Sequence, residues 1–238
     1  MKKKSIFKMM ALSLLFGSIS LGFVACNSDD DDGGVIDKSP AQAIDLGLPS
    51  GTLWASCNVG ATKPEEYGDY YAWGEIIPKY DFRWETYKWC NESKNRLTKY
   101  CHMSYFGNNG FQDNKTELDV EDDTAYMNWG GSWRMPSFIQ IKELINNCSW
   151  EWIKLNGVWG FKGTSRNNGN IIFLPATGYR SSTSNDHVGT AGLYWSRTSD
   201  PEDFPEEAYN IDFYSGHMAW NDICDRCYGL SVRPVRMK

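Results

Sequence analysis

Short apolar runs separated by turn residues make up most of the chain after residue 40. Two such runs, residues 43–46 and 52–55, flank Leu48-Pro49-Ser50-Gly51, whose proline and glycine are typical of a tight reversal. Further strand-like runs follow at residues 171–174, 193–197, 209–214 and 230–235. This pattern predicts many short strands joined by turns.

Helical periodicity occurs in two places, and the clearer one begins after Pro136. There Ser137 and Gln140 have the spacing of a capping box, in which each side chain bonds the backbone N–H of the other residue. The following apolar positions, 138, 141, 144, 145 and 148, fall on one helical face. A second helix is predicted near residues 120–129.

The strongest local turn signal is Asn156-Gly157, which separates strand-like runs at residues 150–155 and 158–162. Asn-Gly favours the two-residue turn that joins antiparallel strands, so a β-hairpin is expected here. Two helices with several short, mostly antiparallel strands predict an α+β domain. Residues 79–116 have weak periodicity and are interpreted as a long insertion within one domain, residues 41–238.

The N-terminus is interpreted as an export signal. Four lysines precede an apolar run that ends at Ala25-Cys26, as in a cleaved signal peptide covering residues 1–25. The next segment, residues 26–40, contains four consecutive aspartates at 29–32 and is too polar to fold, so it is expected to be a flexible tether. A calcium loop starting at Asp29 is excluded, because its twelfth position is Pro40 instead of a bidentate glutamate.

Net charge bears on the class of partner, and cysteine content bears on disulfide formation. Removing residues 1–25 leaves 20 basic against 30 acidic residues, which disfavours a nucleic-acid partner. Six cysteines then remain besides Cys26, an even number that permits disulfides in an exported chain but leaves fifteen complete pairings. Cys90 with Cys101 and Cys224 with Cys227 are the two pairings to examine first.

The sequence lacks the motifs of common enzymes. Its three histidines, His102, His187 and His217, lie outside any metal or triad motif, and there is no phosphate-binding loop or dinucleotide fingerprint. We therefore expect neither an enzyme nor a bound cofactor or metal. Five tryptophans that lie within three residues of a glycine are expected to be core residues: Trp54, Trp73, Trp129, Trp133 and Trp195.

Phe23-Val24-Ala25-Cys26 resembles the lipobox of bacterial lipoproteins, in which the cysteine carries the lipid. The acidic run after Cys26 is similar to the surface-export signal of Bacteroidetes lipoproteins. The resemblance implies that Cys26 anchors the protein in the outer membrane, facing the cell exterior.

Six blocks of sequence together resemble the Fibrobacter succinogenes major paralogous domain family. The blocks are AIDLGLPSGTLWASCNVGA (43–61), YYAWGE (70–75), NWGGSWRMPS (128–137), NGNIIFLPATGYR (168–180), GLYWSRT (192–198) and YGLSVRPVR (228–236). The resemblance implies a fold like that of the C-type-lectin-like domains and the formylglycine-generating enzymes.

The same resemblance implies where a ligand binds. In C-type-lectin-like variable proteins of diversity-generating retroelements, the segment before the final strand forms the binding face and is diversified, and here that segment is residues 209–229. The implied ligand is an external protein or glycan. The implied ligand-binding residues are Asn210, Asp212, Tyr214, His217, Trp220, Asn221, Asp222, Asp225 and Arg226.

Two other functions stay open at this point. The protein could be a structural subunit of a surface or fimbrial assembly. Alternatively, Cys224-Asp225-Arg226-Cys227 could serve a cysteine-dependent oxidase related to the formylglycine-generating enzymes, although the spacing of the two cysteines departs from that family.

Overall fold

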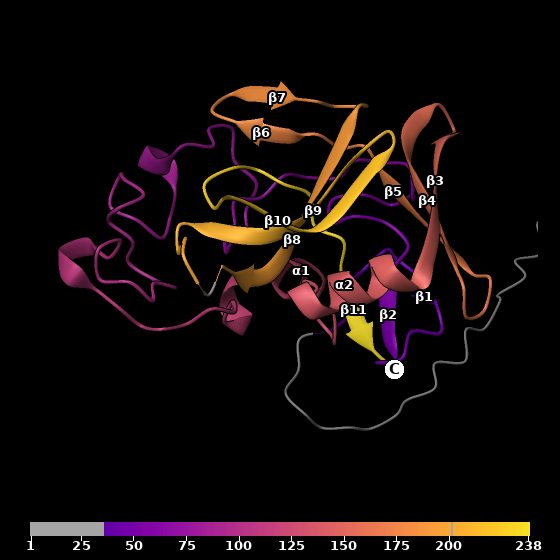
Figure 1. Cartoon of the computed structure of the whole chain (residues 1–238), viewed down its shortest axis with the longest axis horizontal. Coiled ribbons are helices and arrows are strands. Elements are labelled where there is room, and N and C mark those ends of the chain that lie inside the picture. The colour runs from indigo at the N-terminus through magenta and orange to yellow at the C-terminus, as the bar shows by residue number, and fades with distance from the viewer. Residues whose placement is uncertain (1–35, 201) are drawn as a thin grey trace, which may run out of the picture. The chain divides into compact units, whose positions relative to one another are not determined.

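Antiparallel strands dominate the computed structural model, which describes residues 36–200 and 202–238 (Figure 1). Cys26, the predicted signal peptide and most of the predicted tether lie outside the described residues. The described residues belong to one compact unit. No helix among them has the length and apolarity needed to cross a membrane.

The balance of secondary structure corrects the predicted α+β class. Strands make up 36% of the described residues and helices 12%, so the domain is mostly β. The two helices and the antiparallel pairing occur as expected, but the helices have only six and ten residues, and more of the chain is in strands than predicted. The predicted α+β, C-type-lectin-like fold is therefore wrong, and we describe the domain as mostly β.

The central sheet has the strand order β10-β9-β8, formed by β8 (Ala191–Ser199), β9 (Glu207–Tyr214) and β10 (His217–Asp225). All neighbours are antiparallel, and the ladder shifts register once between β8 and β9 and once between β9 and β10. The strand β10 was not predicted, because its alternation of polar and apolar residues is irregular around the register shift at 219–222.

One face of this sheet is covered by α2 (Phe138–Asn147). Ser137 and Gln140 form the predicted capping box: the Gln140 N–H donates to Ser137 Oγ at 3.2 Å, and the Ser137 N–H donates to Gln140 Oε1 at 2.9 Å. Ile141 and Leu144 are buried against the sheet, in a cluster that includes Phe213. The capping box therefore sets the start of a helix whose apolar face builds the first half of the core.

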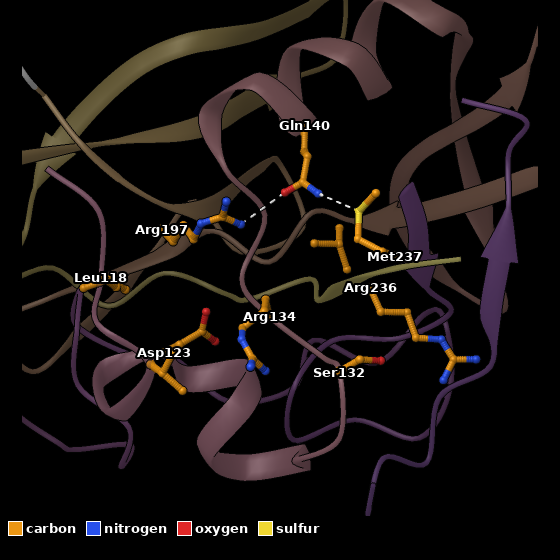
Figure 2. A pocket seen from close by; sticks show the side chains of 10 residues that line it. Leu118, Asp123, Ser132, Arg134, Gln140, Arg197, Arg236 and Met237 are labelled. Atoms are coloured by element: carbon orange, nitrogen blue, oxygen red, sulfur yellow. Dashed lines mark hydrogen bonds between the residues drawn. The ribbon is translucent and has the colours of Figure 1, made fainter. Parts of the chain in front are cut away.

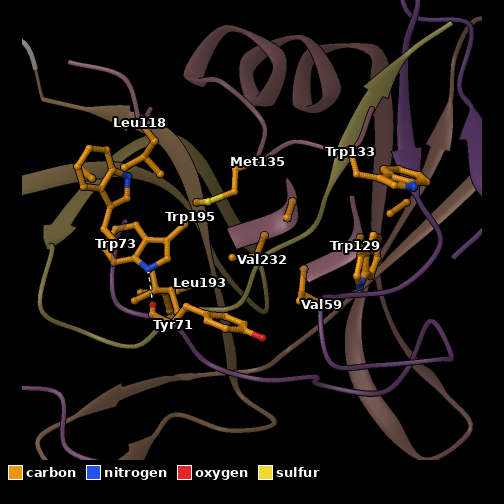
Figure 3. Close-up of a cluster of buried hydrophobic side chains, with 14 of the residues drawn as sticks. Val59, Tyr71, Trp73, Leu118, Trp129, Trp133, Met135, Leu193, Trp195 and Val232 are labelled. Atoms are coloured by element: carbon orange, nitrogen blue, oxygen red, sulfur yellow. Dashed lines mark hydrogen bonds between the residues drawn. The ribbon is translucent and has the colours of Figure 1, made fainter. Parts of the chain in front are cut away.

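The opposite face of the sheet packs on a tryptophan-rich cluster (Figure 3). Trp195 is fully buried there, and its indole N–H donates to the Tyr71 carbonyl at 2.8 Å. The Trp73 indole donates in turn to the Ser196 carbonyl at 2.9 Å. These two bonds join strand β8 to residues more than 120 positions earlier in the chain. All five tryptophans predicted as core are buried, including Trp54 in the α2 cluster.

A second sheet has the order β3-β4-β5, from β3 (Cys148–Leu155), β4 (Val158–Ser165) and β5 (Ile171–Pro175). The predicted hairpin is confirmed, because Leu155 pairs with Val158 across the Asn156-Gly157 turn. Both turn residues have positive φ, +47° and +92°, which Asn and Gly tolerate best.

A third sheet and a short hairpin complete the strands. The third sheet has the order β1-β2-β11, from β1 (Ala43–Asp45), β2 (Thr52–Ala55) and β11 (Val235–Met237). The strand predicted at 230–235 is displaced: those residues make only isolated bridges, and regular pairing starts at Val235. A hairpin that was not predicted, β6 (Tyr179–Ser181) with β7 (Ser184–Asp186), lies above the central sheet in Figure 1.

The segment between β2 and α2 is largely irregular, which the weak periodicity of residues 79–116 predicted for its central part. Its regular elements are short: η1 (Trp84–Thr86), η2 (Asn108–Gly110), η3 (Val120–Asp122) and α1 (Thr124–Trp129). The predicted helix near 120–129 is thus a 3₁₀ turn followed by a short α-helix.

Arg226, just after β10, holds the irregular segment in place. It is fully buried, and its guanidinium donates to the carbonyls of Lys99 (3.1 Å), Tyr100 (2.9 Å) and Pro205 (2.7 Å) and to the Tyr87 hydroxyl (3.0 Å). A buried charge is tolerated only where its hydrogen-bonding capacity is used. The side chain therefore links two loops to the end of the central sheet.

Replacing Arg226 with methionine should remove this link while keeping most of the volume. The free energy of unfolding should fall by about 3 kcal/mol or more, because three carbonyls and a hydroxyl lose a buried donor. Urea denaturation measures the change. Arg96→Met, at an exposed position, is the control and should stay within about 0.5 kcal/mol of wild type. Equal stability of the two variants would contradict the role given to Arg226.

Candidate ligand-binding site

A cavity of about 540 Å³ opens at the hairpin end of the central sheet, where β9 turns into β10. Strands β8, β9 and β10 form one side, and β6 with the loop before β8 forms the other. The volume lies within the range of small-molecule sites. The lining residues are Tyr179, His187, Thr190, Ala191, Leu193, Asp212, Tyr214, Ser215 and Asp222.

The cavity exists because one face of the central sheet is covered by the apolar core at one end and is polar and uncovered at the hairpin end. Trp195 pairs with Asn210 across β8 and β9, and at this level the face is buried in the tryptophan cluster. Two residues nearer the hairpin, Leu193 pairs with Asp212, and the face begins to carry polar groups. At the tip, Tyr214 is 50% exposed. The polar end of the strands thus extends beyond the core that covers the rest of the face.

Gly178 brings the far wall of the cavity close to the sheet. Its N–H donates to the Ala191 carbonyl at 2.7 Å, and its φ is +63°. A Cβ at this position would lie 2.1 Å from the Asp186 carbonyl oxygen, so only glycine fits. The next residue, Tyr179, is thereby placed on the cavity wall.

Aromatic rings form two stacks around the cavity. Tyr214 stacks on His217 with the ring centroids 4.7 Å apart and the planes 21° from parallel. On the other side, Tyr179 stacks on His187 and on Tyr228, each at 5.8 Å. The stacking orients flat ring surfaces at the wall and rim of the cavity, where a ligand can contact them.

Two carboxylates face the same space. Burial, and then the charge of Asp222, raise the pKa of Asp212. Burial also raises the pKa of Asp222, with the Ile223 N–H and the nearby Asn210 amide acting in the opposite direction. Neither carboxylate forms an ion pair within residues 36–200 and 202–238. The cavity is therefore acidic.

The structure brings together part of the predicted ligand-binding set. Asp212, Tyr214 and Asp222 line the cavity, and His217 stacks on Tyr214 at its rim. Asn210 lies on the same face but is fully buried, and its amide nitrogen and oxygen have no hydrogen-bond partner of ordinary geometry in the described part of the chain.

The remaining predicted residues lie elsewhere or are outside what is described. Asp225 pairs with Glu207 at the opposite end of β9 and β10. Arg226 is fully buried by the contacts given above, so a ligand at the surface does not reach it, and it leaves the candidate set. The side chains of Trp220 and Asn221 lie outside the described residues.

Four polar lining residues were missed by sequence reasoning: Tyr179, His187, Thr190 and Ser215. The first three come from the unpredicted β6–β7 hairpin and the loop after it. Tyr179 belongs to the sequence block 168–180, which was used only as part of the family resemblance. Nothing in the local sequence pattern indicated that this block would approach β9. A signal was present only for Ser215, which lies in the Ser215-Gly216 turn inside the segment already predicted to bind.

All six cysteines in the described residues are free thiols, so neither of the two pairings singled out from the sequence, Cys90 with Cys101 and Cys224 with Cys227, is formed in the structure. The Cys90 thiol donates to the Trp84 carbonyl at 3.0 Å and the Cys101 thiol to the Met103 carbonyl at 3.1 Å. Each of these two thiols thus bonds the backbone of its own neighbourhood instead of the other sulfur.

Cys224 and Cys227 pack in different apolar clusters. Burial raises the pKa of both thiols well above the ordinary value. A reactive cysteine requires a lowered pKa, so these two sites lack the activation that the oxidase alternative depends on. No group of three or more His, Cys, Asp and Glu side chains in the described residues is arranged to hold a metal ion.

A second cavity, of about 330 Å³, lies between the α1–α2 region and β11 (Figure 2). Its polar groups are used within the protein. Asp123 accepts the N–H of Tyr126 at 3.0 Å as the N-cap of α1, and Arg197 donates to Gln140 Oε1 at 3.3 Å. In Figure 2 the Arg236 guanidinium points away from the centre of the cavity. These contacts are those of a packing junction, so the cavity at the hairpin end is the better candidate site.

Comparisons of the chain with protein-family models, curated proteins and solved structures found no match.

The acidic end of the central sheet, opposite the cavity, yields a stability prediction. Burial, followed by the Asp225 carboxylate, raises the pKa of Glu207 from 4.5 to about 7. The folded state then holds this proton more tightly than the unfolded state, so stability decreases as pH rises from about 4.5 through about 7.

Glu207→Gln removes the titrating group. The variant should be more stable than wild type at pH 8 by about 1 kcal/mol, a value reduced for solvent screening of a partly exposed group, and the gain should shrink towards pH 4.5. Urea denaturation at pH 5 and pH 8 measures both values. An identical difference at the two pH values would show that the charge of Glu207 is not the cause.

Proposed function

We propose that the chain is an exported lipoprotein, anchored through Cys26 on the outer membrane, whose domain binds a sugar unit of an external glycan. The observation that carries the binding proposal is the cavity at the hairpin end of the central sheet. It combines exposed aromatic surface, two carboxylates and hydroxyl groups in one space of small-molecule size.

The chemistry of this lining suits a sugar ring. A pyranose has an apolar face of C–H groups and an edge of hydroxyls, so it contacts an aromatic ring with one and hydrogen-bond acceptors with the other. Tyr214, half exposed at the tip of β9, offers the ring. Asp212 and Asp222 offer acceptors, and Thr190 and Ser215 add hydroxyls that both donate and accept.

The cavity lies at the segment that the sequence predicted to bind a ligand, residues 209–229. That segment contains β10 and all of β9 except its first two residues, Glu207 and Ala208. Membrane attachment, in contrast, is supported by the sequence around Cys26 alone, and needs its own test.

Tyr214→Ala should weaken binding of any glycan that a glycan array detects by about tenfold, because the stacking surface is lost. Titration calorimetry of the array-selected glycan measures the change. Tyr105→Ala, at a tyrosine that is 73% exposed elsewhere, is the matched control and should bind like wild type. If Tyr214→Ala binds as well as wild type, or if the array detects no glycan, the proposal is wrong.

The anchor is tested separately by Cys26→Ala. Metabolic labelling with a radioactive fatty acid should mark the wild-type protein and leave the variant unlabelled, because the thiol is the attachment atom for the diacylglycerol. Cys57→Ala, at a buried cysteine within the domain, is the control and should keep the label. Equal labelling of wild type and Cys26→Ala would overturn the lipoprotein assignment.

A further inference from the structure

We propose that the sugar unit bound in this cavity carries a free amine, so that the ligand is a cationic amino sugar. This inference rests on the proposed function and specifies its ligand. The feature that carries it is the pair of carboxylates, Asp212 and Asp222, which face the cavity without a cationic side chain to balance them.

Several buried carboxylates elsewhere in the domain have a cationic partner instead. Three carboxylates elsewhere in the domain each have a lysine partner. Asp122, 1% exposed, lies 2.6 Å from the Lys99 ammonium, Glu206, 2% exposed, lies 3.2 Å from that of Lys94, and Glu75 lies 2.8 Å from that of Lys79. Two further buried carboxylates, Asp123 and Asp200, accept backbone N–H groups instead.

The cavity departs from that pattern. None of its described lining residues is lysine or arginine, and its only basic side chain is that of His187. His217 lies at the rim, stacked on Tyr214, and is exposed. Both carboxyl groups are partly buried, and Asp222 adds its own charge to the field at Asp212. Two partly desolvated negative charges without a counter-charge are a favourable place for a cation from the ligand.

The groups around the carboxylates fit a protonated amine as well as a sugar ring. The half-exposed ring of Tyr214 attracts cations through its ring electrons. Asn210 lies on the same face of the sheet, further from the hairpin, and is fully buried. Neither its amide nitrogen nor its amide oxygen has a hydrogen-bond partner in residues 36–200 and 202–238. An ammonium carries three donors, and carboxylates with a neighbouring amide oxygen are acceptors for them.

The test compares sugars that differ in the amine alone. The mature full-length protein in detergent is titrated with a glucosamine tetrasaccharide and with its N-acetylated counterpart, in which the amine is an uncharged amide. We expect the glucosamine form to bind about tenfold more tightly, since only it supplies a charge to the two carboxylates.

The variants locate the preference. Asp212→Asn and Asp222→Asn keep the shape of each side chain and remove its charge, and each should reduce the preference for the amine about threefold or more. Asp225→Asn, at the far end of the same strand, is the matched control and should keep the full preference. Thermal unfolding of each variant confirms that the fold is retained.

The outcomes separate the two proposals. If both tetrasaccharides bind equally, or if Asp212→Asn and Asp222→Asn keep the preference, the amine inference is overturned while glycan binding stands. If neither tetrasaccharide nor any other glycan binds, but a lysine-containing peptide does, the cavity serves a protein ligand and both proposals are overturned.

Discussion

A single buried guanidinium, that of Arg226, connects the irregular part of the chain to the central sheet. Its four hydrogen bonds go to backbone carbonyls and a tyrosine hydroxyl, with no carboxylate partner in the described residues, and its charge lies 4.8 Å from the centre of the Trp73 ring. Because every one of these partners must be in place for the charge to be buried, the loops around residues 100 and 205 are held in one arrangement. The packing of Trp73 on the sheet depends on that arrangement.

This connection determines which part of the sheet is available to a ligand. At the end near Arg226, the sheet face is covered by the tryptophan cluster. At the hairpin end, the same face extends past the core and carries Asp212, Asp222 and Tyr214. The β6–β7 hairpin, placed through Gly178, adds Tyr179 to the other wall. A rigid core with one uncovered polar end is a suitable support for a binding site.

Features encoded by neighbouring residues were predictable from the sequence. The capping box at Ser137 and the Asn156-Gly157 hairpin depend on contacts within three or four residues, and both occur. Features that depend on distant residues were not. Arg226 is a charged residue in a polar segment, and its burial follows from carbonyls about 20 and 126 positions earlier in the chain. The same reason explains why β10 and the β6–β7 hairpin were missed, and why the α+β class gave way to a mostly β domain.

The candidate site was likewise predictable only in part. A family resemblance led us to predict a binding segment at residues 209–229, and three residues of that segment, Asp212, Tyr214 and Asp222, line the cavity. Its other wall, with Tyr179 and His187, required the tertiary structure. A crystal structure of the protein with a bound glucosamine tetrasaccharide tests the central claim most directly. The account predicts one sugar ring against Tyr214, with its amine nitrogen within about 3 Å of an Asp212 or Asp222 oxygen. A ligand bound elsewhere on the domain, with this cavity empty, would contradict it.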